Sequence, residues 1–186
     1  MLHGLVKRTR LFDEQYYLGN NPDIAESRTD ALAHYVVYGD REGRSPMALF
    51  EPPFYRQSTN GWTRHVNALL HFTYVGRYRD TRPSPWFDAG YYLKSNKDVA
   101  RAGIDPLIHY LEWGGMEGRS PCPHFDGSFY LKNNPDVHEA GVNPLLHYLH
   151  HGRAEGRRTV PAIYAGYPDA TEDEAPSPVN PDDDEW

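Results

Sequence analysis

The chain has 186 residues, a formal net charge of −7 and one cysteine. A single cysteine excludes an internal disulfide framework. No stretch approaches the ~20 apolar residues that a membrane-spanning helix needs, and residues 1–10 contain no apolar run of signal-peptide length. We therefore expect no membrane span and, by default, a cytoplasmic location, with secretion by a route that needs no signal peptide as the alternative.

The net charge comes from the C-terminal end. Residues 169–186 contain eight acidic and no basic side chains, which leaves 18 acidic against 19 basic residues in the rest of the chain. This near-neutral body has no basic surplus that would suggest a nucleic-acid partner. Residues 167–186 lack apolar side chains for a core, so we predict a disordered acidic tail. The alternative is a tethered mimic of an anionic ligand.

After residues 1–11, interpreted as the remnant of an N-terminal cap, one unit recurs four times. Its mark is a histidine followed by an aromatic residue, with a glycine five positions later, at spacings of 37, 38 and 38 residues. The histidines are His34, His71, His109 and His147, and the glycines are Gly39, Gly76, Gly114 and Gly152. The repeats span 12–49, 50–86, 87–124 and 125–162, with a short cap to residue 166. Function is therefore expected on a repeated surface.

Each repeat is predicted to contain about three short helices. In the third repeat, Asp88 is suited to cap a first helix that carries Tyr91 and Tyr92. The second helix begins at Asn-Lys-Asp-Val here and at Asn-Pro-Asp-Val in the fourth repeat, where asparagine is expected at the N-cap and proline at the next position. Gly103 and Gly141 should end this helix in the left-handed conformation.

The third helix of the repeat is the best defined. A capping side chain precedes every histidine by four residues, and an apolar stripe follows at helical spacing. The capping residues are Asp30, Asn67, Asp105 and Asn143. We expect the glycine five positions after the histidine to stop this helix. A loop containing Glu-Gly-Arg, or Asp-Thr-Arg in the second repeat, then leads to the next unit.

The pattern as a whole predicts an all-α fold, because no window alternates apolar and polar residues over the length of a strand. Each helix has about two turns, fewer than the ~12–15 residues at which isolated helices become marginally stable. Neighbouring repeats should then supply one another's core. We predict a short, elongated solenoid of four repeats followed by the acidic tail.

The column of histidines suggests metal ligands, but distances argue against this. Packed helices lie ~8–10 Å apart, whereas two ligands of one zinc ion lie within about 4 Å of each other. On a helical wheel the histidine points away from the apolar stripe. We expect its imidazole to hydrogen-bond to the Glu-Gly-Arg loop. The alternatives are an exposed, ligand-contacting role and inheritance by duplication.

The loop arginines have two interpretations. They form ion pairs, within a repeat or between repeats, that join successive turns, or they form a line of guanidinium groups that binds acidic sugars or carboxylates. These arginines are Arg44, Arg82, Arg119 and Arg157. In the degraded second repeat, Trp62 either fills a gap or marks a contact surface. The histidines, the arginines, Trp62 and Trp113 together form the candidate partner surface.

The sequence contains no motif for catalysis. His150 and His151 are adjacent on a helix and point in different directions, which makes a poor chelate. Cys122 beside His124 has no third group to orient it. Groups repeated four times serve folding or repeated binding rather than one asymmetric catalytic centre. We expect no enzyme, no cofactor and no metal.

The repeat has the pattern Phe-Asp-x-x-Tyr-Tyr-Leu-x-x-Asn-Pro-Asp-Val, then Asx-Pro-Leu-x-His-Tyr-Leu, Gly and Glu-Gly-Arg, over residues 12–161. It resembles a bacterial tandem repeat found beside glycosyltransferase domains of surface-polysaccharide assembly and in some secreted bacterial proteins. The resemblance implies a non-catalytic accessory to polysaccharide synthesis or export, and it transfers no catalytic residue. We expect a scaffold that binds a protein partner. The alternative is a glycan-binding module that uses exposed aromatic and arginine side chains.

Deletion of residues 169–186 tests the interpretation of the acidic tail. A segment that buries nothing adds nothing to the folded core, so the melting temperature should stay nearly unchanged. Differential scanning fluorimetry of the full and shortened chains measures this. A fall of more than a few degrees would mean that the tail docks on the repeats.

Overall fold

The computed structural model describes residues 2–59, 63 and 65–161. Helices and turns account for the regular structure of these residues, and none of their backbone forms an extended strand. The predicted all-α class is therefore confirmed. None of the helices in these ranges is long and apolar enough to cross a membrane. Trp62 and the acidic tail lie outside the described residues.

Three of the repeats contain the three predicted helices, and in these the third helix continues into a π-helical turn. The first repeat follows α1 (Leu2–Thr9) and contains α2 (Glu14–Asn20), α3 (Pro22–Ser27), α4 (Ala31–His34) and η1 (Tyr35–Gly39). The third contains α7 (Ala89–Ser95), α8 (Lys97–Ala102), α9 (Pro106–His109) and η3 (Tyr110–Gly114). The fourth contains α10 (Gly127–Asn133), α11 (Pro135–Glu139), α12 (Pro144–His147) and η4 (Tyr148–Gly152).

The second repeat is the exception. Its described residues form α5 (Pro52–Ser58), α6 (Ala68–Tyr74) and a 3-10 turn, η2 (Gly76–Tyr78). Val75 leaves the helical conformation with a φ of −129°, so the helix ends where the other repeats have a π-turn. This difference agrees with the degraded sequence of the repeat.

The predicted helix caps are present. The side chain of each of Asp30, Asn67, Asp105 and Asn143 accepts a hydrogen bond from a backbone N–H of the first turn of its helix. Asp13, Asp88 and Asp126 cap the first helices of their repeats in the same way. Gly103 and Gly141 have φ values of 65° and 64°, in the predicted left-handed region. Local sequence therefore determines where these helices begin and end.

The glycine five positions after each histidine has a role that differs from the prediction. The π-turns η1, η3 and η4 end at this glycine as predicted, but it does not have the positive φ of a left-handed helix stop. A Cβ at Gly114 would overlap the hydroxyl oxygen of Tyr92, and the other three glycines lie against the matching tyrosine in the same way. The glycine is required because a tyrosine hydroxyl packs directly on its Cα.

Each repeat has an aromatic core of its own. In the third repeat, the ring of Tyr92 lies 5.5 Å from the ring of Phe87 and 5.8 Å from that of Tyr110, centroid to centroid. The other repeats contain matching trios: Phe12, Tyr17 and Tyr35; Phe50, Tyr55 and Phe72; Phe125, Tyr130 and Tyr148. The expectation that neighbours supply the core is thus only partly right, although the trios also belong to one continuous buried cluster.

Polar contacts join each repeat to the next at equivalent places, close to the first turn of the third helix. The buried carboxylate of Asp40 accepts hydrogen bonds from Ala68 N at 3.0 Å and from Arg56 Nη2 at 2.5 Å. Arg77 Nη1 donates to Asp105 Oδ2 at 3.2 Å, and Asn143 Nδ2 donates to the carbonyl of Tyr110 at 3.2 Å. The third helix of one repeat therefore docks on the helix end of the preceding repeat.

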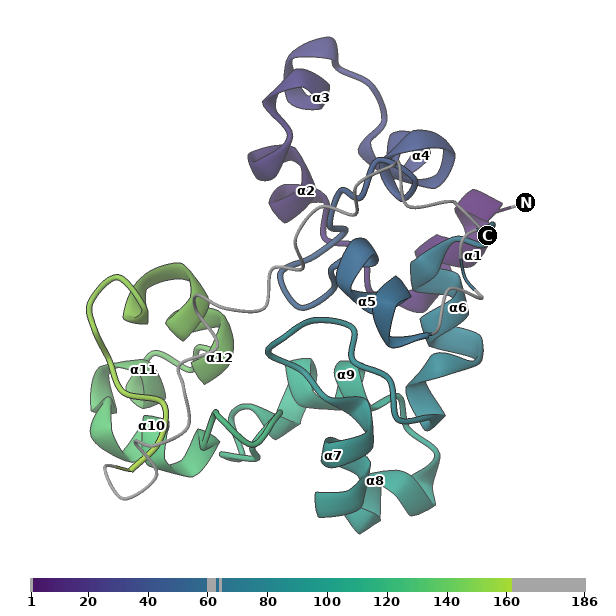
Figure 1. Cartoon of the computed structure of the whole chain (residues 1–186). Helices are drawn as coiled ribbons and strands as arrows, with labels where there is room; N and C mark the ends of the chain where they lie inside the picture. The colour runs from purple at the N-terminus through teal and green to yellow at the C-terminus, as the bar shows by residue number, and fades with distance from the viewer. Residues whose placement is uncertain (1, 60–62, 64, 162–186) are drawn as a thin grey trace, which may run out of the picture.

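The helices do not lie in a line. In Figure 1 the chain runs from α2 at the top through α6 on the right and α8 at the bottom to α10 on the left. An ion pair between Arg10 and Glu112 connects the segment that directly precedes the first repeat with the third repeat. The expectation of an elongated array is therefore wrong, because the first repeat faces the later ones across a hollow.

Replacement of Gly114 by alanine tests the packing of the tyrosine hydroxyl. The added methyl group has no room beside Tyr92, so the variant should lose about 1–3 kcal/mol of unfolding free energy, as overpacked cores do. Urea denaturation measures the loss. Gly4→Ala is the matched control, because a Cβ at Gly4 of α1 meets nothing within 4 Å. Equal stability of the two variants would contradict this account.

Candidate functional site

The repeat histidine forms the same contact in all four repeats. Nδ1 of each histidine lies within hydrogen-bond distance of a tyrosine hydroxyl in the first helix of the same repeat. The pairs are Tyr17–His34 at 2.9 Å, Tyr55–His71 at 2.6 Å, Tyr92–His109 at 2.9 Å and Tyr130–His147 at 3.0 Å. The hydrogen-bond partner of Nδ1 is therefore this tyrosine and not the Glu-Gly-Arg loop that we predicted.

The prediction that the histidine faces away from the core is also wrong. All four tyrosines are fully buried, His109 is only 7 % exposed, and the other three histidines are half-buried. A helical wheel of the third helix shows only the apolar stripe of that helix. It could not show that the first helix of the same repeat covers the opposite side of that helix.

In the pairs of His71, His109 and His147, the environment favours the uncharged forms of both partners. Burial, together with nearby arginines, lowers the pKa of His71, His109 and His147. Burial raises the pKa of Tyr17 and Tyr130 to about 12. A neutral imidazole that accepts at Nδ1 and a hydroxyl that donates to it satisfy one another. The pair is a structural contact within the repeat.

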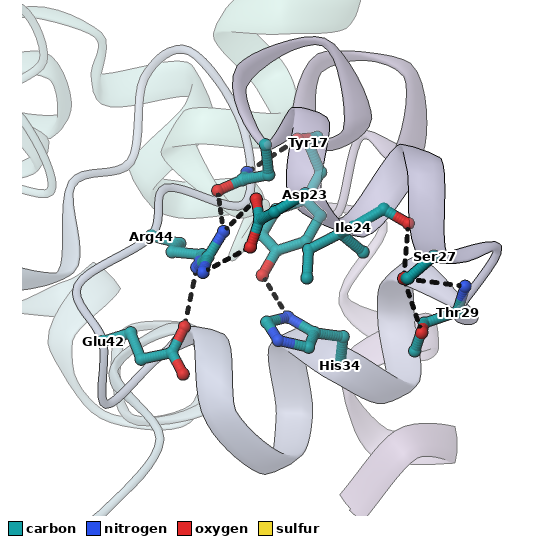
Figure 2. A network of polar contacts seen from close by, with 9 residues as sticks. Tyr17, Asp23, Ile24, Ser27, Thr29, His34, Glu42 and Arg44 are labelled. Atoms are coloured by element: carbon teal, nitrogen blue, oxygen red, sulfur yellow. Dashed lines mark hydrogen bonds and ion pairs between the residues drawn. The ribbon is translucent and has the colours of Figure 1, made fainter.

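The loop arginine of the first repeat is held by a cluster of oxygen acceptors (Figure 2). Arg44 Nε donates to Glu42 at 2.7 Å, and its two terminal nitrogens donate to the carboxylate of Asp23 at 2.8 and 2.9 Å. Arg44 Nη1 also donates to Asn21 Oδ1 at 2.8 Å. The guanidinium group therefore ties the loop to the start of α3.

The same cluster recurs around Arg119 and Arg157, each paired with two carboxylates of its own repeat. The interpretation of these loop arginines as ion pairs is confirmed for three repeats, and their guanidinium groups are not free to bind a row of anions. The asparagine at the start of the second helix takes part as well. Its side chain makes no capping bond but accepts from the arginine, as Asn96 does from Arg119 at 3.0 Å.

Arg82 of the second repeat departs from this pattern. Its guanidinium group lies over the ring of Phe54, 5.4 Å from the centroid, and Nη2 donates to the carbonyl of Pro85 at 3.2 Å. The loop acid, Asp80, pairs instead with Lys94 of the third repeat at 2.8 Å. The second repeat lacks the Asn-Pro-Asp segment, and no equivalent acceptor is paired with Arg82 among the residues of this repeat that the structure describes.

Each repeat exposes one side chain at an equivalent position near the end of its third helix, and we call these four side chains the outer row. It comprises the residues four positions after each repeat histidine: Tyr38, Val75, Trp113 and His151. Tyr38 is 58 % exposed and Trp113 is 49 % exposed. The rings of Tyr38, Trp113 and His151 each lie 5.6–5.7 Å from the ring of the repeat histidine. Of the predicted surface, Trp113 is the member with a broadly exposed side chain among the described residues.

A hollow of about 640 Å³ lies between the first repeat and the last two repeats. One wall comes from α2 and the turn before it, including Phe12, Tyr16 and Gly19. Leu111 of η3 and Leu146 of α12 form the opposite wall. We call this hollow the inter-repeat groove. No local sequence pattern indicates this groove, because its two walls come from repeats that are far apart in the chain.

The remaining candidates are Cys122 and the adjacent histidines His150 and His151. The thiol of Cys122 is buried, and burial raises its pKa to about 12. The rings of His150 and His151 lie 6.2 Å apart, centroid to centroid, and are nearly perpendicular. In the part of the chain that the structure describes, no three histidine, cysteine or acidic side chains come together as a metal site would require.

Comparisons with protein-family models, curated proteins and solved structures find no match to this chain.

The histidines predict how stability depends on pH. Because the folded pKa of His71, His109 and His147 lies below the ordinary value of 6.5, the unfolded chain binds more protons in acid. Stability should therefore be fully present above pH ~6.5 and fall as the pH decreases from there towards 5. Thermal unfolding between pH 5 and pH 8 measures this. A melting temperature that is constant or rises on acidification would contradict the prediction, and His109→Gln should reduce the decline.

Proposed function

We propose that this chain is a non-catalytic helical-repeat scaffold that binds a protein partner through the outer row. The four repeats act as one short solenoid, in which equivalent polar contacts join each unit to the next. The protein does not catalyse a reaction and uses no cofactor or metal. The resemblance to the bacterial tandem repeat suggests a partner in cell-surface polysaccharide assembly, in the cytoplasm or at the cell surface.

The exposure of Tyr38 and Trp113 is the observation that carries this proposal. The tyrosines, histidines and loop arginines of the repeat are engaged inside it, so they are not available as a binding surface. The outer row instead presents large flat side chains to solvent. Tyrosine and tryptophan are the residues that most often dominate the binding energy of protein interfaces. Their rings are held in place by the repeat histidine, which reduces the entropy that binding must remove.

A second candidate is a glycan-binding module, and the inter-repeat groove is the observation that favours it. The groove combines half-buried aromatic rings with amide and guanidinium groups. The loop arginines lend this candidate no support, because carboxylates already occupy three of them.

Affinity capture separates the two candidates. The full chain is immobilised, exposed to a lysate of its source organism, and compared with the double variant Tyr38→Ser, Trp113→Ser. We expect the wild type to retain a protein that the double variant loses at least tenfold, because two exposed ring contacts are removed. Mass spectrometry with labelled lysates measures the ratio.

The matched control is Val66→Ser, Val142→Ser. These side chains are 48 % and 41 % exposed but lie outside the outer row. Equal losses in both double variants would indicate non-specific apolar adsorption and contradict the proposal. A glycan array run in parallel identifies the second candidate if only sugars are retained.

A further inference from the structure

We propose that the inter-repeat groove is a binding site for a short, neutral oligosaccharide. This goes beyond the proposed protein partner, because the groove and the outer row share no residue. The volume of about 640 Å³ lies within the range of about 300–1,000 Å³ that is typical of ligand sites.

The strongest observation is a helical glycine that the fold itself does not require. Gly19 lies in α2 and faces the groove, and a Cβ there would meet nothing within 4 Å. The equivalent positions in the other repeats carry Gln57, Lys94 and Lys132. Glycine inside a helix costs up to about 1 kcal/mol relative to ordinary residues. A role that offsets this cost is the close approach of a ligand to the bare backbone.

Tyr16 gives the groove a flat face with a polar end. Its side chain is half-buried, and its pKa is raised by burial and by the nearby carboxylates of Glu51 and Asp13. Within the described residues, its hydroxyl has no hydrogen-bond partner, unlike that of its neighbour Tyr17, which bonds to His34. A half-buried ring with an unpaired hydroxyl can stack on an apolar ring face and still bond to a ligand.

The polar groups of the groove favour a neutral ligand with hydroxyl groups. The guanidinium of Arg10 is paired with Glu112, and the carboxylate of Asp13 accepts from Tyr16 N at 2.9 Å, so the groove offers no unpaired positive charge from Arg10 to an anionic ligand. The amides of Gln15 and Asn20 line the same space. An amide both donates and accepts hydrogen bonds, as a sugar hydroxyl does.

The apolar side chains of the groove also suit a sugar ligand. Leu111 and Leu146 are partly buried on the wall opposite α2, with Phe12 beside Tyr16. A pyranose ring has apolar faces and a polar edge, which suits a groove with apolar walls and amides along the rim. An anionic polymer would gain no net charge attraction here, because the carboxylate of Asp13 lines the groove and the positive charge of Arg10 is paired with Glu112.

The test is binding of the purified full chain to an array of neutral and acidic oligosaccharides, followed by calorimetric titration with the strongest neutral hit. We expect a neutral oligosaccharide to bind the wild type. Gly19→Lys should weaken binding at least tenfold, because the added side chain fills the groove. The fold should accept this change, since the third and fourth repeats carry lysine at the same position. Tyr16→Ala should weaken binding to a similar extent.

Two matched controls exclude effects on the fold. Gly4→Lys adds the same charged side chain to a helical glycine outside the groove, and Tyr91→Ala removes the equivalent ring of the third repeat. Both should bind within twofold of the wild type.

Absence of binding to every sugar, binding of acidic sugars alone, or neutral-sugar binding that Gly19→Lys leaves unchanged would each overturn the proposal. Selection of apolar peptides from a displayed library, with binding that Gly19→Lys abolishes, would assign the groove to a peptide and overturn it as well. None of these results changes the outcome of the affinity capture with the outer-row variants.

Discussion

In every repeat, one tyrosine hydroxyl lies between the Nδ1 of a histidine and the Cα of a glycine. The tyrosine comes from the first helix, and the other two residues come from the third, so this contact fixes how the two helices cross. A buried hydroxyl without an acceptor costs about 1–3 kcal/mol, which makes the histidine necessary. The lack of a Cβ at the glycine gives the hydroxyl its space.

The same contact accounts for the spacing of five residues between histidine and glycine. On an α-helix, residues five apart point about 140° away from each other. A π-turn, with its i→i+5 hydrogen bonds, brings them to nearly the same side. The bonds from Asp40 N to Tyr35 O and from Gly115 N to Tyr110 O show this geometry. The second repeat reaches the contact by a different route, because its helix breaks at Val75.

Local features of the fold were predictable from the sequence, and long-range ones were not. Capping side chains such as Asp105 and Asn143 act on the amides two and three positions ahead, so their residue types suffice to locate helix starts. The role of Gly114 could not be predicted, because it depends on Tyr92 in another helix. The groove depends on the angle between successive repeats, which contacts such as Arg56 to Asp40 set. No periodic pattern in the sequence reports that angle.

The first repeat differs from its copies where it faces the groove. Gly19 and Asn20 replace the lysine–serine and lysine–asparagine pairs of the third and fourth repeats. The clusters that maintain each repeat, around Tyr–His and around the loop arginine, are unchanged there. Duplication thus preserved the internal contacts, while the surface diverged between copies. For this reason, we expect function at the outer row and at the inter-repeat groove.

A double-mutant cycle on Tyr92→Phe and His109→Leu tests the central contact most directly. Unfolding free energies of the wild type, the two single variants and the double variant are measured by urea denaturation. If the hydroxyl and the imidazole stabilise the repeat through one another, the coupling energy should be at least about 1 kcal/mol. Losses that add to within about 0.5 kcal/mol would show that the two groups act independently and would contradict this account.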